Sequence, residues 1–322
     1  MSDELKQHPL KTLANIPAAQ PGNDPVPVDT DHESRITHHA SLVSHHSSLI
    51  THHSSLSDDY KQRAREQWSA NPCGASAARD REFGTREYFD AIETHRYEIE
   101  SPWMKQVIGF DRYKGKRLLE VGFGTGTDLL QFARAGAHVT GVDLTPRSIE
   151  IARRRFELYG LTGEFTIGDG ESLSFPDSSF DVVYSFGVLH HTPDTERAVR
   201  EIHRVLKPGG KAIVMLYHRA SLYYWGGLFF KHGILGGELF KESMAAIMSR
   251  RVEYSETNGR PLVKAYTRDE ARHMFSDFRD CHLQVNQLTR RELRPVGRFI
   301  PEALFQWIAR GFGWNLLITA TK

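Results

Sequence analysis

The sequence predicts an α/β fold built around a largely parallel sheet with helices on both faces. Between residues 116 and 217, short apolar runs alternate with longer segments of helical periodicity, which is the pattern of consecutive βαβ units. A turn with glycine at every second position separates the first apolar run from the first helical segment. Two further apolar runs follow near the C-terminus. Together these runs predict a seven-stranded, mostly parallel sheet.

Each element of the alternating region has its own local signal. The strands are expected at the runs KRLLEV, AHVTGVD, GEFTIGD, FDVVYSFG and KAIVMLY. The helix after the second strand should begin with Thr145 as its N-cap and Pro146 in its first turn, and should end at Gly160. The helix after the fourth strand should begin near Asp194 and stop at a Pro-Gly-Gly sequence.

Beyond Tyr217 the pattern is less regular. Residues 218–265 are expected to form an insert rich in aromatic residues and glycine. Thr267 and Glu270 then fit a capping box that opens a helix. The two late strands, CHLQVNQL and WNLLITATK, are expected to pair antiparallel and to close the edge of the sheet.

Residues 1–57 differ in composition from the rest of the chain. Four prolines lie within residues 14–30, and three copies of a seven-residue unit rich in Ser, Thr and His follow from Thr37 to Ser57. With one or two apolar residues per unit, these copies cannot bury enough surface to offset the loss of chain entropy. We predict a disordered, low-complexity tail, whose histidines can bind metal ions loosely.

A helical N-terminal extension is expected over residues 58–110, before a main domain over residues 111–322. Aromatic and apolar residues recur there at helical spacing and predict a buried face. They are Tyr88, Phe89, Ile92, Tyr97 and Ile99.

The composition argues against several classes of function. Lys and Arg total 41 and Asp and Glu total 40, so a net charge of +1 gives no general electrostatic case for binding nucleic acid. The two cysteines, Cys73 and Cys281, predict reduced thiols and no disulfide framework. The first residues lack the apolar core of a secretion signal, and no run of 18 apolar residues occurs. We therefore expect a cytoplasmic protein without a membrane-spanning helix.

The stretch LLEVGFGTGTDLL, residues 118–130, predicts a ligand site. Gly122, Gly124 and Gly126 allow the backbone to turn tightly and to approach a ligand closely. The helix that follows would present free N–H groups beyond the carboxyl end of a parallel strand, where open sheets bind ligands. Neither common nucleotide-binding pattern fits, because Thr127 replaces the third glycine of a dinucleotide loop and no phosphate-loop Lys-Ser or Lys-Thr follows.

Four segments in combination resemble the class I S-adenosylmethionine-dependent methyltransferases that act on small molecules. They are LLEVGFGTG, GVDLTPRSIEIAR, GDGESLSFPDSSFDVVYSFGVLHH and REIHRVLKPGGKAIVMLY, and the resemblance covers residues 83–217. It implies a Rossmann-like fold, S-adenosyl-L-methionine as the cofactor, and methyl transfer to a small-molecule acceptor.

The resemblance also implies which residues bind the cofactor. Asp143 would accept the ribose hydroxyls, unless it only caps the next helix, and Asp169 would accept the adenine amino group, unless it is only a turn residue. Glu120 would either order the glycine loop or meet the amino group of the methionine part. The implied set is Glu120, Gly122, Phe123, Gly124, Gly126, Asp143, Leu144, Asp169, Gly170 and Ser185.

Two lid residues are expected in the N-terminal extension. Such extensions form a lid in this family, so Tyr88 and Arg96 would close over the cofactor, unless they only pack within the helices.

The candidates for a general base are His190 and His191, which follow the fourth strand. Imidazole titrates near neutrality and can take a proton there, although both residues could instead only line the site. Tyr217 and His218 are further candidates. No paired Asp-Asp-Asn motif of the catechol-type relatives is visible, so we predict no metal ion. The absence of an Asn/Asp-Pro-Pro-aromatic motif argues against methylation of nucleic acid bases.

The insert is expected to cover the acceptor and to favour an apolar or aromatic compound. Its aromatic residues are Tyr223, Tyr224, Trp225, Phe229 and Phe230. The same residues could instead form the core of a helical lid or make shallow contact with a membrane. Two alternatives therefore stay open: a methyltransferase acting on a lipid or quinone at a membrane surface, and a non-catalytic cofactor-binding fold that serves as a partner-binding module.

Overall fold

The computed structural model describes residues 57–253, 261–290, 293 and 297–322. All of them belong to one compact unit, Ser54–Lys322. The predicted tail, residues 1–57, lies outside the described residues except for Ser57, where a helix over 57–70 begins. Among the described residues, no helix is long and apolar enough to cross a bilayer.

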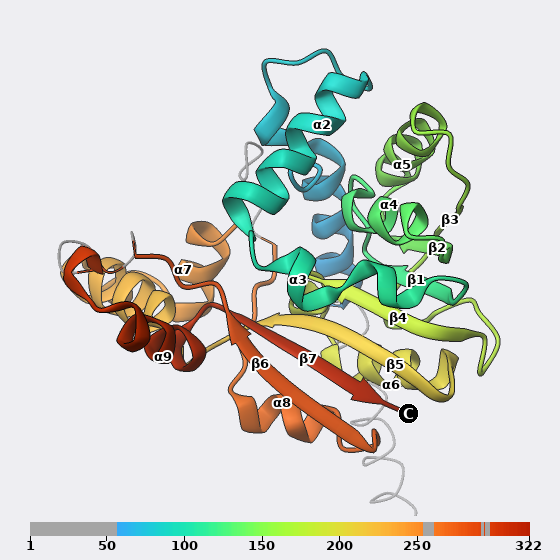
Figure 1. Cartoon of the computed structure of the whole chain (residues 1–322). Helices are drawn as coiled ribbons and strands as arrows, with labels where there is room; N and C mark the ends of the chain where they lie inside the picture. Colours follow the sequence, from blue (N-terminus) through green and yellow to red (C-terminus); the bar gives the residue numbers. More distant parts are fainter. Residues whose placement is uncertain (1–56, 254–260, 291–292, 294–296) are drawn as a thin grey trace, which may run out of the picture. The chain divides into compact units, whose positions relative to one another are not determined.

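Seven strands form one sheet in the order β3-β2-β1-β4-β5-β7-β6 (Figure 1). The strands are β1 (Arg117–Val121), β2 (His138–Asp143), β3 (Glu164–Ile167), β4 (Phe180–Phe186), β5 (Leu206–Tyr217), β6 (Asp280–Asn286) and β7 (Asn315–Thr321). The first five are parallel, and β7 runs antiparallel between β5 and β6. The predicted seven-stranded, mostly parallel Rossmann-like sheet is confirmed, and the two late strands pair antiparallel and close one edge of it, as predicted.

Helices cover both faces of this sheet (Figure 1). On one face α6 (Thr195–Val205) and α8 (Arg268–Met274) pack on alternate strand residues such as Leu119 and Val214. On the other face α4 (Thr127–Arg134) and α5 (Pro146–Leu158) pack on the intervening residues, such as Leu118 and Ile213. The alternation follows from the two-residue period of a strand.

The predicted helix starts are confirmed. The Thr145 side chain accepts a hydrogen bond from the Ser148 N–H, with Pro146 at the first helical position. Asp194 caps α6 in the same way. Thr267 and Glu270 form both hydrogen bonds of a capping box at α8.

The N-terminal extension is helical, as predicted. After the helix over 57–70 come η1 (Ala75–Ala78), α2 (Arg86–Thr94), the π-helical η2 (His95–Glu100), α3 (Met104–Ile108) and η3 (Phe110–Tyr113). Tyr88, Phe89, Ile92 and Tyr97 are buried. The prediction for Ile99 is wrong, since its side chain is 68% exposed. It lies in η2, where i→i+5 hydrogen bonding changes the helical period on which the prediction relied.

The insert after β5 is also helical. It contains the π-helical η5 (Tyr223–Leu235), η6 (Glu238–Phe240) and α7 (Met244–Arg251). A small core of its own forms around Leu228, Met248, Val263 and Ala265. The short η7 (Gly297–Phe299) is followed by a further helix, α9 (Glu302–Phe312), and α9 is followed by β7.

Candidate functional site

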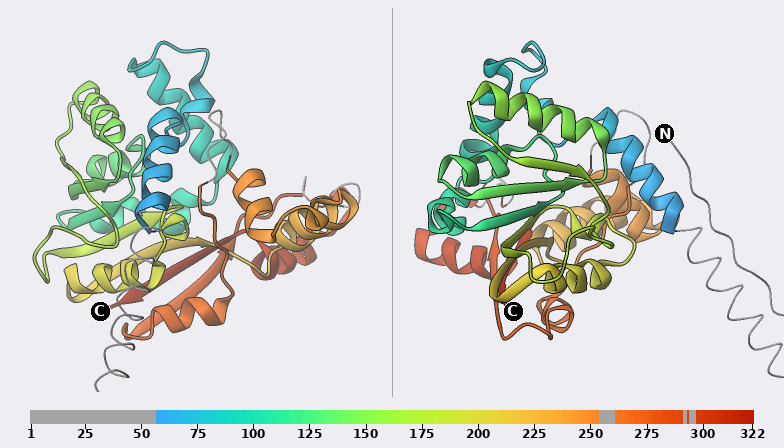
Figure 2. Two further views of the ribbon diagram at one scale, coloured as in Figure 1. Left: turned by 180° about the vertical axis from the view of Figure 1, so that it is seen from behind. Right: turned by 90° about the vertical axis from the view of Figure 1, so that its right-hand side faces the viewer.

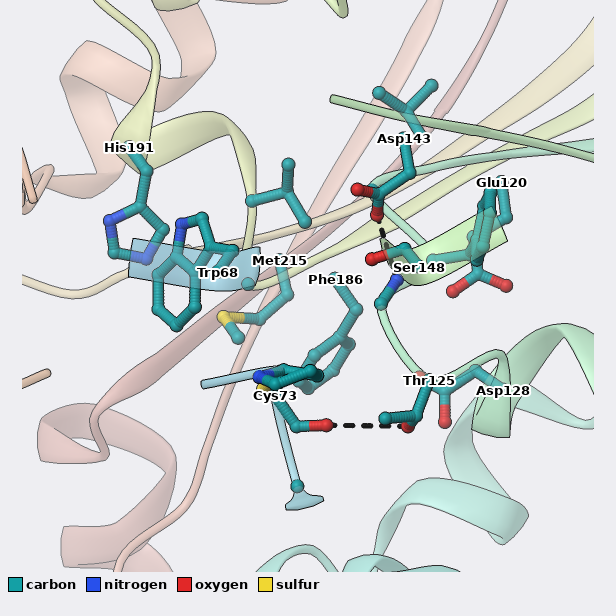
Figure 3. A pocket seen from close by; sticks show the side chains of 18 of the residues that line it. Trp68, Cys73, Glu120, Thr125, Asp128, Asp143, Ser148, Phe186, His191 and Met215 are labelled. Atoms are coloured by element: carbon teal, nitrogen blue, oxygen red, sulfur yellow. Dashed lines mark hydrogen bonds between the residues drawn. The ribbon is translucent and has the colours of Figure 1, made fainter. Parts of the chain in front are cut away.

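A cavity of about 430 Å³ lies at the carboxyl ends of the parallel strands. The loops after β1, β2, β3 and β4 form one end of it, and residues of the insert, of β5 and of the start of β7 form the other. Figure 3 shows Glu120 and Asp143 at one end, and His191 and Trp68 at the other. The N-terminal extension contributes Lys61, Trp68 and Arg96 to the lining.

The glycine loop after β1 has the conformation that its sequence predicts. Gly122, Gly124 and Gly126 all have positive φ, at 76°, 53° and 70°, a region that side chains disfavour. A Cβ atom on Gly122 would clash with the side chain of Val188, so any other residue there would force Val188 to move. At Gly124 the nearest atom would be the Cβ of Cys73, at 3.7 Å, so this backbone is open toward the cavity.

Asp143 ties the loop to the end of β2. Its Oδ2 accepts a hydrogen bond from Gly124 N at 3.0 Å (Figure 3). Its Oδ1 accepts from the backbone N–H and the hydroxyl of Thr145, at 3.0 and 2.9 Å. Asp143 and the neighbouring Leu144 both line the cavity. A carboxylate has about four lone-pair positions, so these bonds leave capacity for a ligand hydroxyl.

Glu120 is a buried acid with an unused oxygen. Its side chain lines the cavity and is only 4% exposed, and Oε2 has no hydrogen bond. Burial raises the pKa of Glu120 well above its ordinary value; nearby Asp128 and Asp143 add to this, and Arg96 opposes it. Within the described chain, no hydrogen bond from this side chain orders the glycine loop. A buried unsatisfied oxygen of this kind fits a cationic ligand group.

Asp128 anchors a network that the sequence did not predict. Its carboxylate accepts hydrogen bonds from Arg96 Nη2 at 2.8 Å, Tyr97 OH at 2.7 Å and Tyr184 OH at 2.8 Å. Burial alone would raise the pKa of Asp128, but Arg96 and the two tyrosines bring it below its ordinary value. The network joins η2 of the extension to α4 and β4. Arg96 lines the cavity, whereas Tyr88, the other expected lid residue, packs in a core with Phe89.

Asp169 and Gly170 line the cavity beyond β3. Asp169 Oδ1 accepts from Glu171 N at 2.9 Å, and Oδ2 lies 2.7 Å from Lys61 Nζ. Lys61 also contacts Glu171 at 2.6 Å and so connects the helix over 57–70 to this loop. No local pattern around Lys61 indicates this role.

His191 faces the cavity at the opposite end. Its Nδ1 lies 2.7 Å from the Leu262 carbonyl oxygen, and its Nε2 lies 3.3 Å from Glu253 Oε1. Tyr217 OH donates to the same Glu253 oxygen at 2.7 Å. Burial alone would raise the pKa of Glu253, but contact with His191 and Tyr217 lowers it. If Nδ1 donates to the carbonyl, a neutral His191 directs the lone pair of Nε2 toward a carboxylate, and only a proton fits between these two atoms.

His190 has a different environment from its neighbour. It is fully buried outside the cavity lining, stacks on Tyr217 at 3.8 Å between ring centroids, and neither ring nitrogen has a hydrogen bond. Burial lowers the pKa of His190 well below its ordinary value. The ligand atoms of His190, His191 and Glu253 lie within 4.8 Å of one another, so they are the group of described residues that could hold a metal ion.

Gln287 joins the extension to the acceptor end. It is a non-glycine residue with a φ of 64°, and it lines the cavity just after β6. Its Oε1 accepts from Trp103 Nε1 at 2.9 Å, and its Nε2 donates to the Glu100 carbonyl at 2.6 Å.

Nine of the twelve predicted site residues line this one cavity. They are Glu120, Gly122, Phe123, Gly124, Asp143, Leu144, Asp169, Gly170 and His191. The other three lie behind it: Gly126 packs against Ala152 on α5, the buried Ser185 hydroxyl donates to the Val121 carbonyl, and His190 packs on Tyr217.

Residues 119–214 match the family model described as a methyltransferase domain. This chain carries a class I methyltransferase domain. The cofactor of that class is S-adenosyl-L-methionine, and the resemblance drawn from the four sequence segments is confirmed. The antiparallel β7, inserted between β5 and β6 in an otherwise parallel sheet, agrees with this assignment.

Curated relatives of the methyltransferase domain differ in their substrates. The chain is 41% identical over 101 residues to demethylmenaquinone methyltransferase of Tropheryma whipplei, covering 31% of this chain and 41% of that protein. It is 45% identical over 98 residues to a phthiotriol/phenolphthiotriol dimycocerosates methyltransferase of Mycobacterium leprae, covering 30% and 36%. A sterol 4-C-methyltransferase of Caenorhabditis elegans is 40% identical over 98 residues, covering 30% and 29%. The chain therefore spans less than half the length of these relatives.

The solved structures that are similar to this chain include a SAM-dependent methyltransferase of Methanosarcina mazei. The TM-score is 0.49 at 24% identity, covering 67% of this chain and 96% of that chain.

Proposed function

We propose that this protein transfers a methyl group from S-adenosyl-L-methionine to a small apolar acceptor. The observation that carries the proposal is a single cavity that joins two chemically different ends. One end has the open glycine loop and the acids Glu120, Asp143 and Asp169, and the other has aromatic side chains around His191 and Glu253.

The residues at the first end fit the cofactor. Asp143 has capacity for a ribose hydroxyl, and the open backbone at Gly124 permits close approach. Asp169 and Gly170 would meet the adenine. The unused Glu120 Oε2 would pair with the cationic amino group, which favours that role over ordering the loop. When bound, the cofactor supplies a methyl group on a positively charged sulfur.

The N-terminal extension, residues 58–110, is proposed to act as a lid over the cofactor. The polar contacts that hold it against the methyltransferase domain include Lys61 to Asp169, Arg96 to Asp128, and Trp103 to Gln287. Trp68 and Cys73 complete the cover. Such a cover excludes water and restricts the orientation of the reactants, which are the main sources of rate in a transfer of this kind.

The second end is proposed to bind the acceptor. Phe186, Met215, Tyr223 and Trp314 line it with apolar surface, which favours an apolar or aromatic compound. An acceptor hydroxyl or amine would donate its hydrogen bond to His191 Nε2. His191 would then take the proton, and the adjacent Glu253 carboxylate would stabilise the resulting imidazolium. The relatives named for demethylmenaquinone, sterol and phthiotriol lipids support an apolar acceptor of this kind.

Calorimetric titration of the purified full chain with S-adenosylmethionine and S-adenosylhomocysteine tests the first part. We expect micromolar binding of both and loss of binding in Asp143→Ala, with the exposed Asp80→Ala as a matched control. Acceptors presented with a labelled methyl donor then test the second part. Absence of binding by both ligands would refute the proposal and favour a partner-binding module on the same fold.

A further inference from the structure

Large apolar side chains are exposed mainly on two segments. Nine of the thirteen exposed large hydrophobic residues in the described chain lie within residues 225–240 and 299–312. We call these nine the apolar surface. They are Trp225, Phe230, Ile234, Leu235, Phe240, Phe299, Leu304, Trp307 and Phe312. Such a concentration indicates a site of interaction, whereas exposed hydrophobic residues that are scattered singly need no explanation.

Helical geometry aligns the members of each segment. In the π-helical η5, Trp225, Phe230 and Ile234 are four or five residues apart and so lie on one side of the helix. In α9, Leu304 and Trp307 are three residues apart and share a face, while Phe305 is buried and anchors the helix. Phe230 and Trp307 are 53% and 68% exposed, so neither stripe is fully covered by the described chain.

The two segments meet beside the acceptor end of the cavity. Tyr223, the first residue of η5, contacts Trp314, which follows α9, at 5.0 Å between ring centroids. Both of these aromatic residues line the cavity. Figures 1 and 2 place the insert helices and α9 at the same end of the described unit. An apolar compound that leaves the apolar surface would therefore meet the acceptor end directly.

Among the described residues, the charges around the apolar surface that are left without an ion-pair partner are positive. Its acidic residues are paired: Glu238 contacts Arg250 and Arg251, and Glu302 contacts Arg290. Lys231, Lys241 and Arg310 are exposed and make no ion pair within the described chain. Aromatic and aliphatic side chains bordered by cations are the combination that binds an anionic bilayer surface.

We propose that the apolar surface docks on an anionic lipid bilayer and that the acceptor enters the cavity from that bilayer. The second half rests on the proposed function, whereas the docking itself does not. A second copy of the chain is a poorer occupant, because a two-fold symmetric contact would bring Lys231, Lys241 and Arg310 toward the same cations of the other copy. The bilayer instead offers phosphate groups to these cations and acyl chains to the aromatic residues.

Sedimentation of the full chain with vesicles tests the docking. Vesicles of phosphatidylglycerol and phosphatidylethanolamine are compared with vesicles of phosphatidylcholine alone. We expect stronger binding to the anionic vesicles, weakened by added salt. The paired changes Trp225→Ser with Phe230→Ser, and Leu304→Ser with Trp307→Ser, should each lower vesicle affinity at least about tenfold. Lys231→Glu with Lys241→Glu should lower it for anionic vesicles alone.

Matched controls are Ile99→Ser and Phe83→Ser, which remove exposed apolar side chains from the N-terminal extension, 68% and 47% exposed. Both should keep full vesicle binding. Every variant should retain the wild-type affinity for S-adenosylmethionine and the wild-type melting temperature, which excludes misfolding. Failure of the wild type to bind the cofactor would refute the proposed function without affecting the vesicle result.

Three outcomes would overturn the docking proposal. The first is no binding to anionic vesicles, and the second is binding that the apolar-surface variants leave unchanged. The third is a wild-type dimer in light scattering that the same variants dissociate, which would assign the apolar surface to a second copy.

Discussion

Replacing Glu120 with glutamine should weaken cofactor binding and at the same time stabilise the ligand-free protein. Glu120 is 4% exposed, and its Oε2 has no hydrogen bond. Burial raises the pKa of this carboxyl, and Asp128 and Asp143 add to the effect. Glutamine preserves the shape of the side chain and removes the charge. The charge is therefore unfavourable without the cofactor and becomes useful only when the amino group arrives.

The size of the binding effect follows from the bond that is lost. A hydrogen bond to a charged group contributes about 1.5–3 kcal/mol. Its loss corresponds to a dissociation constant roughly 10 to 150 times higher. The Glu120→Gln protein should show this loss for both S-adenosylmethionine and S-adenosylhomocysteine, because both ligands carry the same amino group.

The stability effect has a defined pH dependence. A carboxyl whose pKa is raised by folding keeps its proton longer in the folded state than in the unfolded chain. The wild type therefore loses stability as the pH rises from the unfolded value, about 4.3, up to the raised folded pKa, and the loss is constant above it. Glu120→Gln should accordingly melt higher than the wild type at neutral pH, and the difference should disappear in acid.

Calorimetric titration and thermal melts at several pH values measure the two effects. Glu164→Gln, an exposed change on β3, is the matched control and should alter neither. An unchanged dissociation constant in Glu120→Gln would show that this acid does not meet the amino group. A lower melting temperature at neutral pH would show that Glu120 has a structural role, such as ordering the glycine loop.

Three further predictions concern single residues and a metal ion. Gly122→Ala should lower the free energy of unfolding in denaturant by about 2–5 kcal/mol, because φ is positive and the new Cβ would clash with Val188. Gly160→Ala, where φ is also positive but nothing lies within 4 Å, should lower it by about 1–2 kcal/mol, and equal losses would contradict the close-contact reasoning. His191→Ala should slow methyl transfer about 10²- to 10⁴-fold without changing cofactor affinity, and the buried His190→Phe should leave the chemistry intact; the reverse order would assign the proton to His190. Dialysis against a chelator should leave both cofactor affinity and transfer rate unchanged, because the Glu253 carboxylate and the Leu262 carbonyl already orient His191; a lost rate that zinc restores would instead place a metal at His190, His191 and Glu253.

The sequence predicts well those features that depend on only a few neighbouring residues. The glycine loop, the acid at the end of β2 and the helix caps depend on local backbone geometry, so their patterns are visible without the fold. The parallel pairing of β1 to β5 follows from the alternation of strands and helices, but this alternation does not determine the strand order.

The contacts between distant segments were not predictable in this way. Lys61 reaches Asp169 across more than a hundred residues, and Glu253 reaches His191 from the insert. Neither lysine nor glutamate has a local pattern that distinguishes a buried contact from a solvated charge. Ile99 illustrates the related limit of periodicity, since a local change from α- to π-helix moved it to the surface.

The insert contributes more to the cavity than its sequence suggested. Of its five candidate aromatic residues, Tyr223 lines the cavity, while Trp225 and Phe230 are half exposed on the apolar surface. The insert also supplies Glu253, the only carboxylate within the described chain that contacts His191. Acceptor binding and proton removal are thus proposed to depend on one segment, and that segment also carries half of the apolar surface. His190 and His191 share one short turn, yet their environments differ: His191 lines the cavity and contacts Glu253, whereas His190 is buried against Tyr217.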